Sequence, residues 1–187
     1  FDMSDILPII RNYYTYNGTM YSMPFNSSNA VLYYNKDMFR AAGLDPDAPP
    51  ATFAEMGEYA KALQTDEVAG VALPIDCSLF EFNMVNIGKE IVDNGNGRTA
   101  RATRAVFSEN GGGLEVFEAY NELYQTGATS DFGSDSLQAF MGQKTAMTIS
   151  SSSLISTVAK TVGENFEVGV APMPLVDPQT DCGIPVG

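Results

Sequence analysis

The sequence predicts an α/β domain, in which a layered sheet carries helices on its faces. Short apolar runs of strand length alternate along the chain with longer segments whose apolar residues recur at helical spacing. The 187 residues are 44% hydrophobic and 11% aromatic, which is enough to fill one sizeable core. No internal repeat and no linker divides the chain, so residues 1–187 are expected to form a single unit.

Cap and turn residues set the expected boundaries in the first half. Gly43 can end a short helix because glycine adopts the left-handed conformation without strain. Thr52 and Glu55 have the spacing of a capping box, so a helix is expected to begin there. The expected elements are a helix at 4–14, strands at 19–23 and 30–34, a short helix ending at Gly43, a helix at 52–64 and a strand at 68–73.

The second half repeats the alternation of helices and strands. The Asn-Gly pairs at 94–97 tolerate positive φ, so a surface hairpin is expected between 90–93 and 103–107. Four serines at 150–153 separate a buried strand from the next helix. The other expected elements are helices at 79–88, 114–125, 135–141 and 154–162, and strands at 145–149 and 166–171.

Composition excludes several classes of function. A net charge of −13 would repel a phosphate backbone, so nucleic-acid binding is not expected. The chain has no histidine and so lacks the commonest general base and zinc ligand. Its longest apolar runs are only a few residues, too short to span a membrane. Cys77 and Cys182 could pair in an oxidising compartment, although isolated cysteines in a chain of this size are more often free and buried.

No motif for catalysis or cofactor binding stands out. The glycines at 111–113 lack the Gly-Lys-Ser/Thr ending of a P-loop, and no loop has the pattern of a calcium site. A hydrolase with paired carboxylates could recruit Asp76, Glu81 or Asp131, but no spacing singles out a pair. No cofactor and no metal are expected. A glycosidase-like hydrolase and a scaffold module remain the alternatives to a binding protein.

Two loops rich in hydroxyl and amide groups each adjoin the end of a predicted strand. Residues 26–29 read Asn-Ser-Ser-Asn, and residues 150–153 are all serine. Free N–H groups at a helix start, together with serine hydroxyls, make a cradle for an anion or a sugar hydroxyl. Turn chemistry and helix capping would explain the same residues without a ligand. Because both loops follow this pattern, the sequence favours binding of a small polar molecule.

Several motifs in order resemble family 1 extracellular solute-binding proteins of ABC importers. The resemblance covers almost the whole chain, and its motifs look most like those of the glycerol-3-phosphate-binding members. It implies one α/β lobe of a two-lobe, type II periplasmic-binding-protein-like fold. The motifs are YSMPFNSS at 21–28, VLYYNKDMF at 31–39, AGLDP at 42–46, PPATF at 49–53, FMGQKTAMT at 140–148 and VGVAPMP at 168–174.

The resemblance also implies a function and a set of ligand contacts. The protein would capture glycerol-3-phosphate, a glycerophosphodiester or a sugar such as a maltodextrin between its lobes, outside the cytoplasm, and deliver it to an ABC permease. It would be a monomer, and any lipid anchor would lie outside this chain. The ligand contacts would be Asn26 with Ser27 or Ser28, one or two of Ser150, Ser151, Ser152 and Ser153, and also Phe80 and Gly187.

Two features depart from the family's pattern. The glycerol-3-phosphate-binding members have tryptophans in the loop after the 68–73 strand, whereas this chain has no Trp and offers Phe80 instead. The second lobe would lie before residue 1 and after residue 187, together with the basic residue that would neutralise a phosphate. The abrupt ends of the sequence suggest a piece of a longer protein.

Overall fold

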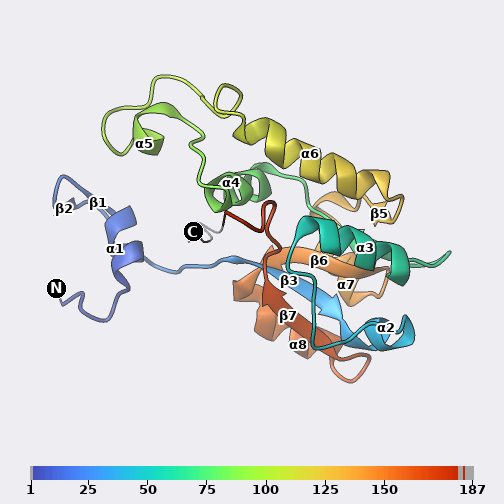
Figure 1. The fold of residues 1–187 in the computed structure, drawn as a ribbon. Helices are drawn as coiled ribbons and strands as arrows, with labels where there is room; N and C mark the ends of the chain where they lie inside the picture. Colours follow the sequence, from blue (N-terminus) through green and yellow to red (C-terminus); the bar gives the residue numbers. More distant parts are fainter. Residues whose placement is uncertain (1, 181–182, 184–187) are drawn as a thin grey trace.

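The main body of the molecule is a sheet with helices on both faces. The computed structural model describes residues 2–180 and residue 183 (Figure 1). Five strands form this sheet in the order β5–β4–β6–β3–β7, and the layered α/β fold predicted from the sequence is confirmed. The strands are β3 (Ala30–Asn35), β4 (Ala69–Ala72), β5 (Thr129–Ser130), β6 (Thr145–Ser151) and β7 (Val168–Pro172).

The strand directions bring several loops to one edge of the sheet. β4 runs parallel to β5 and β6, whereas β3 is antiparallel to both β6 and β7. In this register Ala30 at the start of β3 lies opposite Ser151 at the end of β6. The loop before β3 and the loops after β4, β5 and β6 therefore share an edge. The predicted strand at 145–149 continues two residues further, through Ser151.

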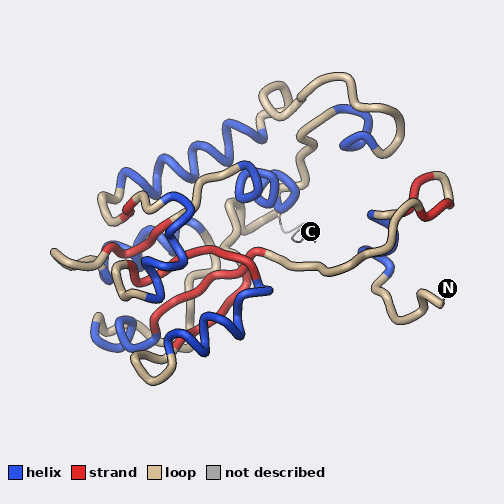
Figure 2. The backbone as a smooth tube through the Cα atoms, turned by 180° about the vertical axis from the view of Figure 1, so that it is seen from behind, coloured by secondary structure: helices blue, strands red, loops and turns tan. Residues whose placement is uncertain are grey.

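The two faces of the sheet are covered by different helices (Figure 2). Because alternate residues of a strand point to opposite faces, Leu32 and Tyr34 of β3 join one core cluster and Tyr33 joins the other. The first cluster includes residues of α3 (Phe53–Leu63), α4 (Cys77–Asn86) and α6 (Gly112–Gln125). The second includes Phe140 of α7 (Ser136–Met141) and Val158 of α8 (Ile155–Val162). Short 3-10 turns, η1 (Gly133–Asp135) and η2 (Ser152–Leu154), precede α7 and α8.

Side-chain caps start two of the helices, one of them at Thr52, where the sequence predicted it. Before α2 (Lys36–Ala41), the Asn35 side chain accepts hydrogen bonds from the N–H groups of Asp37 and Met38, each at 3.0 Å. Before α3, the Thr52 hydroxyl accepts from the Glu55 N–H at 3.1 Å. The Glu55 carboxylate accepts in return from the N–H of Ala51 at 2.7 Å, one residue earlier than in a standard capping box.

Residues 2–20 form an arm that lies apart from the sheet (Figures 1 and 2). The arm contains α1 (Pro8–Tyr13) and a small hairpin of β1 (Thr15–Tyr16) and β2 (Thr19–Met20). None of the residues of α1 is buried. The helix predicted at 4–14 starts only at Pro8, and the strand predicted at 19–23 is only two residues long. An extended segment at 21–29 joins the arm to β3.

The hairpin predicted between 90 and 107 is wrong. Only Val92 and Ala105 form an antiparallel bridge there, and residues 93–97 form the short element α5 (Asp93–Gly97). The side chain of Asn96 accepts hydrogen bonds from Ile91 and Val92, and Asp93 accepts from the N–H and hydroxyl of Thr103. These side-chain bonds replace the strand ladder. Asn94, Gly95 and Asn96 all have positive φ, as the Asn-Gly composition allows.

Candidate functional site

A cleft of about 430 Å³ lies at the sheet edge where β4 and β6 end and β3 begins. Three segments far apart in the sequence line most of it: the residues entering β3, the loop after β4 with the start of α4, and the end of β6. A turn after β5 completes the wall. The lining residues are Ser28, Asn29, Ala30, Pro74, Asp76, Ser78, Leu79, Phe82, Ser134, Ile149, Ser150 and Ser151.

The structure brings the two hydroxyl-rich loops together. Two hydrogen bonds join them: the Asn29 N–H donates to the Ser152 hydroxyl at 3.0 Å, and the Ser152 N–H donates to the Asn29 carbonyl at 2.7 Å. Because this junction fixes the loops side by side, Ser28, Ser150 and Ser151 face the same cleft. The predicted convergence of these loops is therefore present in the structure, while their role in binding stays a prediction.

The other predicted serine-loop and asparagine residues do not line the cleft. Asn26 and Ser27 are exposed on the extended segment before β3 and do not line the cleft. Ser153 donates its N–H to the Ser151 hydroxyl at 3.2 Å, and Ser152 is held by Asn29, so these two serines maintain the turn. Gly187 lies outside the described residues.

The start of η2 differs from the cradle expected at the serine loop. That expectation assumed free N–H groups at the start of the following helix. The Ser152 N–H donates to the Asn29 carbonyl on the loop before β3, and the Ser153 N–H donates to the Ser151 hydroxyl. These two N–H groups are therefore in use, and the hydroxyls of Ser151, Ser152 and Ser153 also take part in hydrogen bonds between the loops or within the turn.

Phe80 lies in an aromatic cluster on α4 and does not line the cleft. Its ring stacks on that of Phe117 with centroids 5.2 Å apart, and it meets the edge of Phe107 at 5.3 Å. The aromatic side chain at the cleft is instead Phe82, two residues further along the helix. Residues two apart on a helix point in different directions, so only the phase of α4 distinguishes them. The sequence alone does not show which side of α4 faces the cleft.

The loop after β4 supplies the charge of the cleft. Asp76 caps α4: its Oδ1 accepts the Leu79 N–H at 2.9 Å. Ser78 follows on the first turn of the same helix, and Cys77 between them has an exposed, free thiol. Their position after a predicted strand could have marked Asp76 and Ser78 as site residues. Ser134 had no such signal, because β5 has only two residues and was not predicted.

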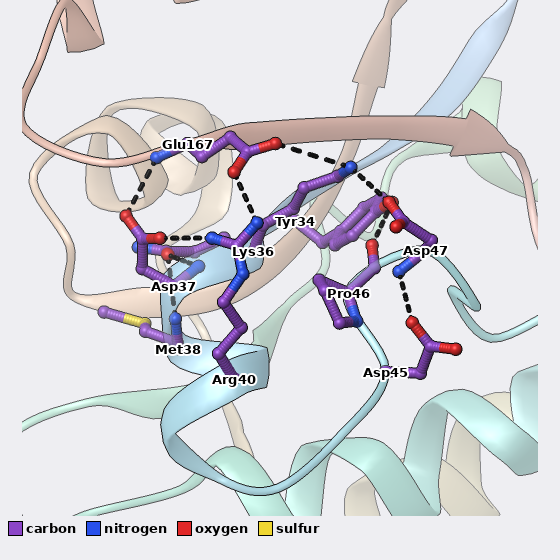
Figure 3. Close-up of polar contacts among 10 residues, drawn as sticks. Tyr34, Lys36, Asp37, Met38, Arg40, Asp45, Pro46, Asp47 and Glu167 are labelled. Atoms are coloured by element: carbon purple, nitrogen blue, oxygen red, sulfur yellow. Dashed lines mark hydrogen bonds and ion pairs between the residues drawn. The ribbon is translucent and has the colours of Figure 1, made fainter.

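No positive charge lines the cleft. The chain has ten lysines and arginines, all of them in described positions, and none is a lining residue. Lys36 and Arg40 lie at the opposite end of β3, where they pair with acidic side chains (Figure 3). The Lys36 ammonium, 2.6 Å from Asp47 Oδ1, lowers the pKa of that carboxyl. Of the described residues that line the cleft, only Asp76 is charged.

This arrangement suits binding better than catalysis. Hydrolysis by paired carboxylates needs two facing groups, whereas Asp76 is the single carboxylate among the described lining residues. The described residues contain no group of three or more His, Cys, Asp or Glu side chains that could hold a metal ion. In the same part of the chain, no helix is both long and apolar enough to cross a bilayer. The cleft does offer several serine hydroxyls beside the apolar side chains of Ala30, Leu79, Phe82 and Ile149.

Comparison with known proteins places the chain in a family. Residues 1–185 match the model for "Bacterial extracellular solute-binding protein". The sn-glycerol-3-phosphate-binding periplasmic protein UgpB of Rhizobium meliloti is 35% identical over 185 residues, and that of Pectobacterium atrosepticum is 31% identical over 179 residues. Each alignment covers 92% of this chain. The chain spans only 41% and 40% of the lengths of these relatives.

Solved structures agree with this placement. The GacH receptor of Streptomyces glaucescens, solved alone and in complex with acarbose, matches all of this chain and 47% of its own length, with a TM-score of 0.77 and 25% identity. UgpB of Mycobacterium tuberculosis, in complex with glycerophosphocholine, matches 92% of this chain and 42% of its own length, with a TM-score of 0.72 and 22% identity. The resemblance and the type II, single-lobe fold expected from the motifs are confirmed. The chain belongs to the family of bacterial extracellular solute-binding proteins.

Proposed function

We propose that this chain forms one lobe of the substrate-binding component of an ABC importer, and that the cleft at the sheet edge is its half of the solute site. One observation carries this proposal. Ser28, Ser150 and Ser151 come from separate segments and yet line one cleft, beside Asp76 and Ser78. A concave site with a few convergent polar groups on rigid elements is the usual form of a small-molecule site.

The comparisons support a small polar solute. The curated relatives are named for sn-glycerol-3-phosphate, and the matching structures contain glycerophosphocholine and acarbose. We therefore propose glycerol-3-phosphate, a glycerophosphodiester or a sugar as the solute class. Release to the transmembrane subunits of a permease, a location outside the cytoplasm and a monomeric state belong to the same proposal, as does any lipid anchor beyond this chain.

Exposed aromatic side chains on the arm and on the extended segment at 21–29 support the proposal of a second lobe that would close the cleft. Tyr13, Tyr21 and Phe25 are 65%, 73% and 98% exposed, although large apolar side chains of this kind are usually covered. The arm also lies away from the sheet, beyond the extended segment that enters β3 at the cleft (Figure 1). We propose that these side chains pack on the second lobe, and that the segment at 21–29 belongs to the hinge about which the lobes close.

A thermal-shift panel on the full-length protein tests the function. The panel contains sn-glycerol-3-phosphate, glycerophosphocholine, maltotriose and D-mannitol, each at saturating concentration. A ligand that binds only the folded state stabilises it, so at least one compound should raise the melting temperature, and titration calorimetry should confirm its binding. Hydrolytic turnover of a panel compound, lost in Asp76→Asn, would contradict the proposal and favour a hydrolase.

A further inference from the structure

A buried tyrosine of β3 is bonded to the serine loop, residues 150–153, at the edge of the cleft. We infer that Tyr33 is a positioning residue of the solute site: its hydroxyl holds the backbone at Ser151 and thereby places the two serines that line the cleft. Tyr33 itself does not line the cleft. This inference rests on the proposed function and adds to it a residue that acts without touching the solute.

The Tyr33 side chain connects the core of the domain with the serine loop. It is buried in the core cluster that includes Phe140, and the two rings lie 6.2 Å apart. In the strand register Tyr33 faces Thr148, yet its hydroxyl donates to the Ser151 carbonyl at 2.7 Å, three residues further along β6. Burial raises the pKa of Tyr33 to about 12, so the hydroxyl stays a donor at neutral pH. The core therefore holds the end of β6.

The serine loop is fastened at two further points. The paired bonds between Asn29 and Ser152 tie it to the segment that enters β3. Within the loop, the Ser151 hydroxyl accepts the Ser153 N–H at 3.2 Å. Together with the bond from Tyr33, these contacts place the serines of the cleft before a solute arrives. A site held in its binding geometry avoids the entropic cost of ordering its side chains when the ligand binds.

The bond from Tyr33 links the loop to a side chain that cannot move with it. The two other fastenings join surface segments, whereas the Tyr33 ring is fixed by the packed core. Without the hydroxyl, the Ser151 carbonyl would turn toward water to regain a hydrogen bond. The backbone at residues 150–151 would turn with it, and the hydroxyls of Ser150 and Ser151 would leave their places at the cleft.

The next residue along the strand supplies a matched comparison. Tyr34 is 4% exposed against 0% for Tyr33, and its hydroxyl also donates to a backbone carbonyl, that of Pro46, at 2.9 Å (Figure 3). Successive residues of a strand point to opposite faces, and Tyr34 belongs to the other core cluster. Neither Tyr34 nor Pro46 lines the cleft. Tyr34→Phe therefore removes the same group from an equally buried site without touching the serine loop.

Titration calorimetry on the full-length protein compares the wild type with Tyr33→Phe and Tyr34→Phe. The probe is whichever of sn-glycerol-3-phosphate, glycerophosphocholine, maltotriose and D-mannitol binds the wild type. Phenylalanine keeps each ring in the core, so both variants should fold, and binding is measured well below their melting temperatures. Both should melt below the wild type, but only Tyr33→Phe should raise the dissociation constant, by about tenfold.

A double-mutant cycle with Ser150→Ala separates positioning from a general loss of stability. Ser150→Ala removes one of the hydroxyls that Tyr33 is inferred to place. Tyr33→Phe should therefore raise the dissociation constant by a smaller factor in this background than in the wild type. An effect that only reflects stability would be the same in both backgrounds.

Two results would overturn the inference and leave the proposed function intact. In the first, Tyr33→Phe binds the probe as tightly as Tyr34→Phe does. In the second, Tyr33→Phe weakens binding by the same factor with and without Ser150→Ala. If the wild type binds none of the four compounds, the proposed function itself fails, and the inference fails with it.

Discussion

At the scale of single residues, Glu167 shows how one side chain ties distant segments together (Figure 3). It lies just before β7, accepts a hydrogen bond from the Arg40 guanidinium of α2, and donates its own N–H to the Asp37 carboxylate at 3.0 Å. The Lys36 ammonium lies 3.5 Å away. The hydrogen bond from Arg40, with the charges of Arg40 and Lys36, lowers the pKa of the Glu167 carboxyl below its ordinary value of 4.5.

This lowered pKa predicts how Glu167→Gln changes stability with pH. Because the pKa is lower in the folded state, the ionised carboxylate stabilises the fold above the unfolded value, and this contribution disappears as pH falls through the folded pKa. Urea unfolding should show a small deficit for Glu167→Gln near pH 7, since the site is exposed, and a smaller deficit as the pH is lowered toward 3. Glu164→Gln should match the wild type at both pH values. A deficit that persists or grows in acid would contradict the ion-pair assignment.

At the scale of elements, α4 links the cleft to the packed interior. Its N-cap Asp76 and its first-turn residue Ser78 lie at the cleft, and its buried face carries Asn83, which is 0% exposed. The Asn83 side chain donates to the hydroxyl of Tyr120 on α6 at 2.7 Å and to the Leu79 carbonyl at 3.0 Å. Burial also raises the pKa of Tyr120 well above its ordinary value. The cleft wall is thereby anchored to α6.

Tyr120→Phe removes the buried hydroxyl at the α4–α6 contact. A buried hydrogen bond of this kind contributes about 1–2 kcal/mol, so the free energy of unfolding should fall by about that amount. Tyr124→Phe is the control: it lies one turn further along α6, is only half-buried, and loses less than about 0.5 kcal/mol. Chemical denaturation measures both variants. Equal effects would mean that the Asn83–Tyr120 bond does not stabilise the contact.

The helices and strands also show which features of the fold could be predicted from the sequence and which could not. Thr52 starts its helix as predicted because capping depends only on neighbouring residues. The hairpin at 90–107 failed because Asp93 and Asn96 bond to backbone groups that a ladder would otherwise use. β5 was missed because its two residues are fixed by pairing with β4, which is a tertiary effect.

The site was predicted to a similar extent. The two strand-end loops were expected to share one rim without a choice among their serines, and the structure places Ser28, Ser150 and Ser151 at the cleft. Their contact with a solute stays a prediction. To identify Phe82 rather than Phe80 as the aromatic residue of the cleft, one must know which side of α4 faces the cleft. To identify Ser134, one must know where β5 lies in the sheet. Both depend on contacts between elements that are distant in sequence.

At the scale of the whole molecule, the sheet has its own core, whereas the arm has none. Buried residues on both faces of the sheet form two clusters, but α1 contributes no buried residue. Arg98 ties the arm to the α5 region through bonds to the carbonyls of Asn12 and Tyr13, at 2.6 and 3.2 Å. The body is therefore expected to fold alone, with the arm lacking most of its packing partners.

The 187-residue chain alone should unfold cooperatively and yet bind its solute far more weakly than the full-length protein. The chain spans about two fifths of the length of its curated relatives, so a site closed between two lobes would lack half of its contacts. Calorimetry with the panel compound that binds the full-length protein measures the difference. Micromolar binding by the 187-residue chain would contradict the two-lobe site.

The central claim is that hydroxyls gathered at one edge of the sheet hold the solute. The most direct measurement is the dissociation constant of that solute for full-length Ser28→Ala and Ser150→Ala, with Ser156→Ala on the exposed part of α8 as control. Each cleft variant should weaken binding by about 1–3 kcal/mol, because a buried ligand group would lose its partner. The control should be unchanged. Wild-type affinity in both cleft variants would contradict the claim.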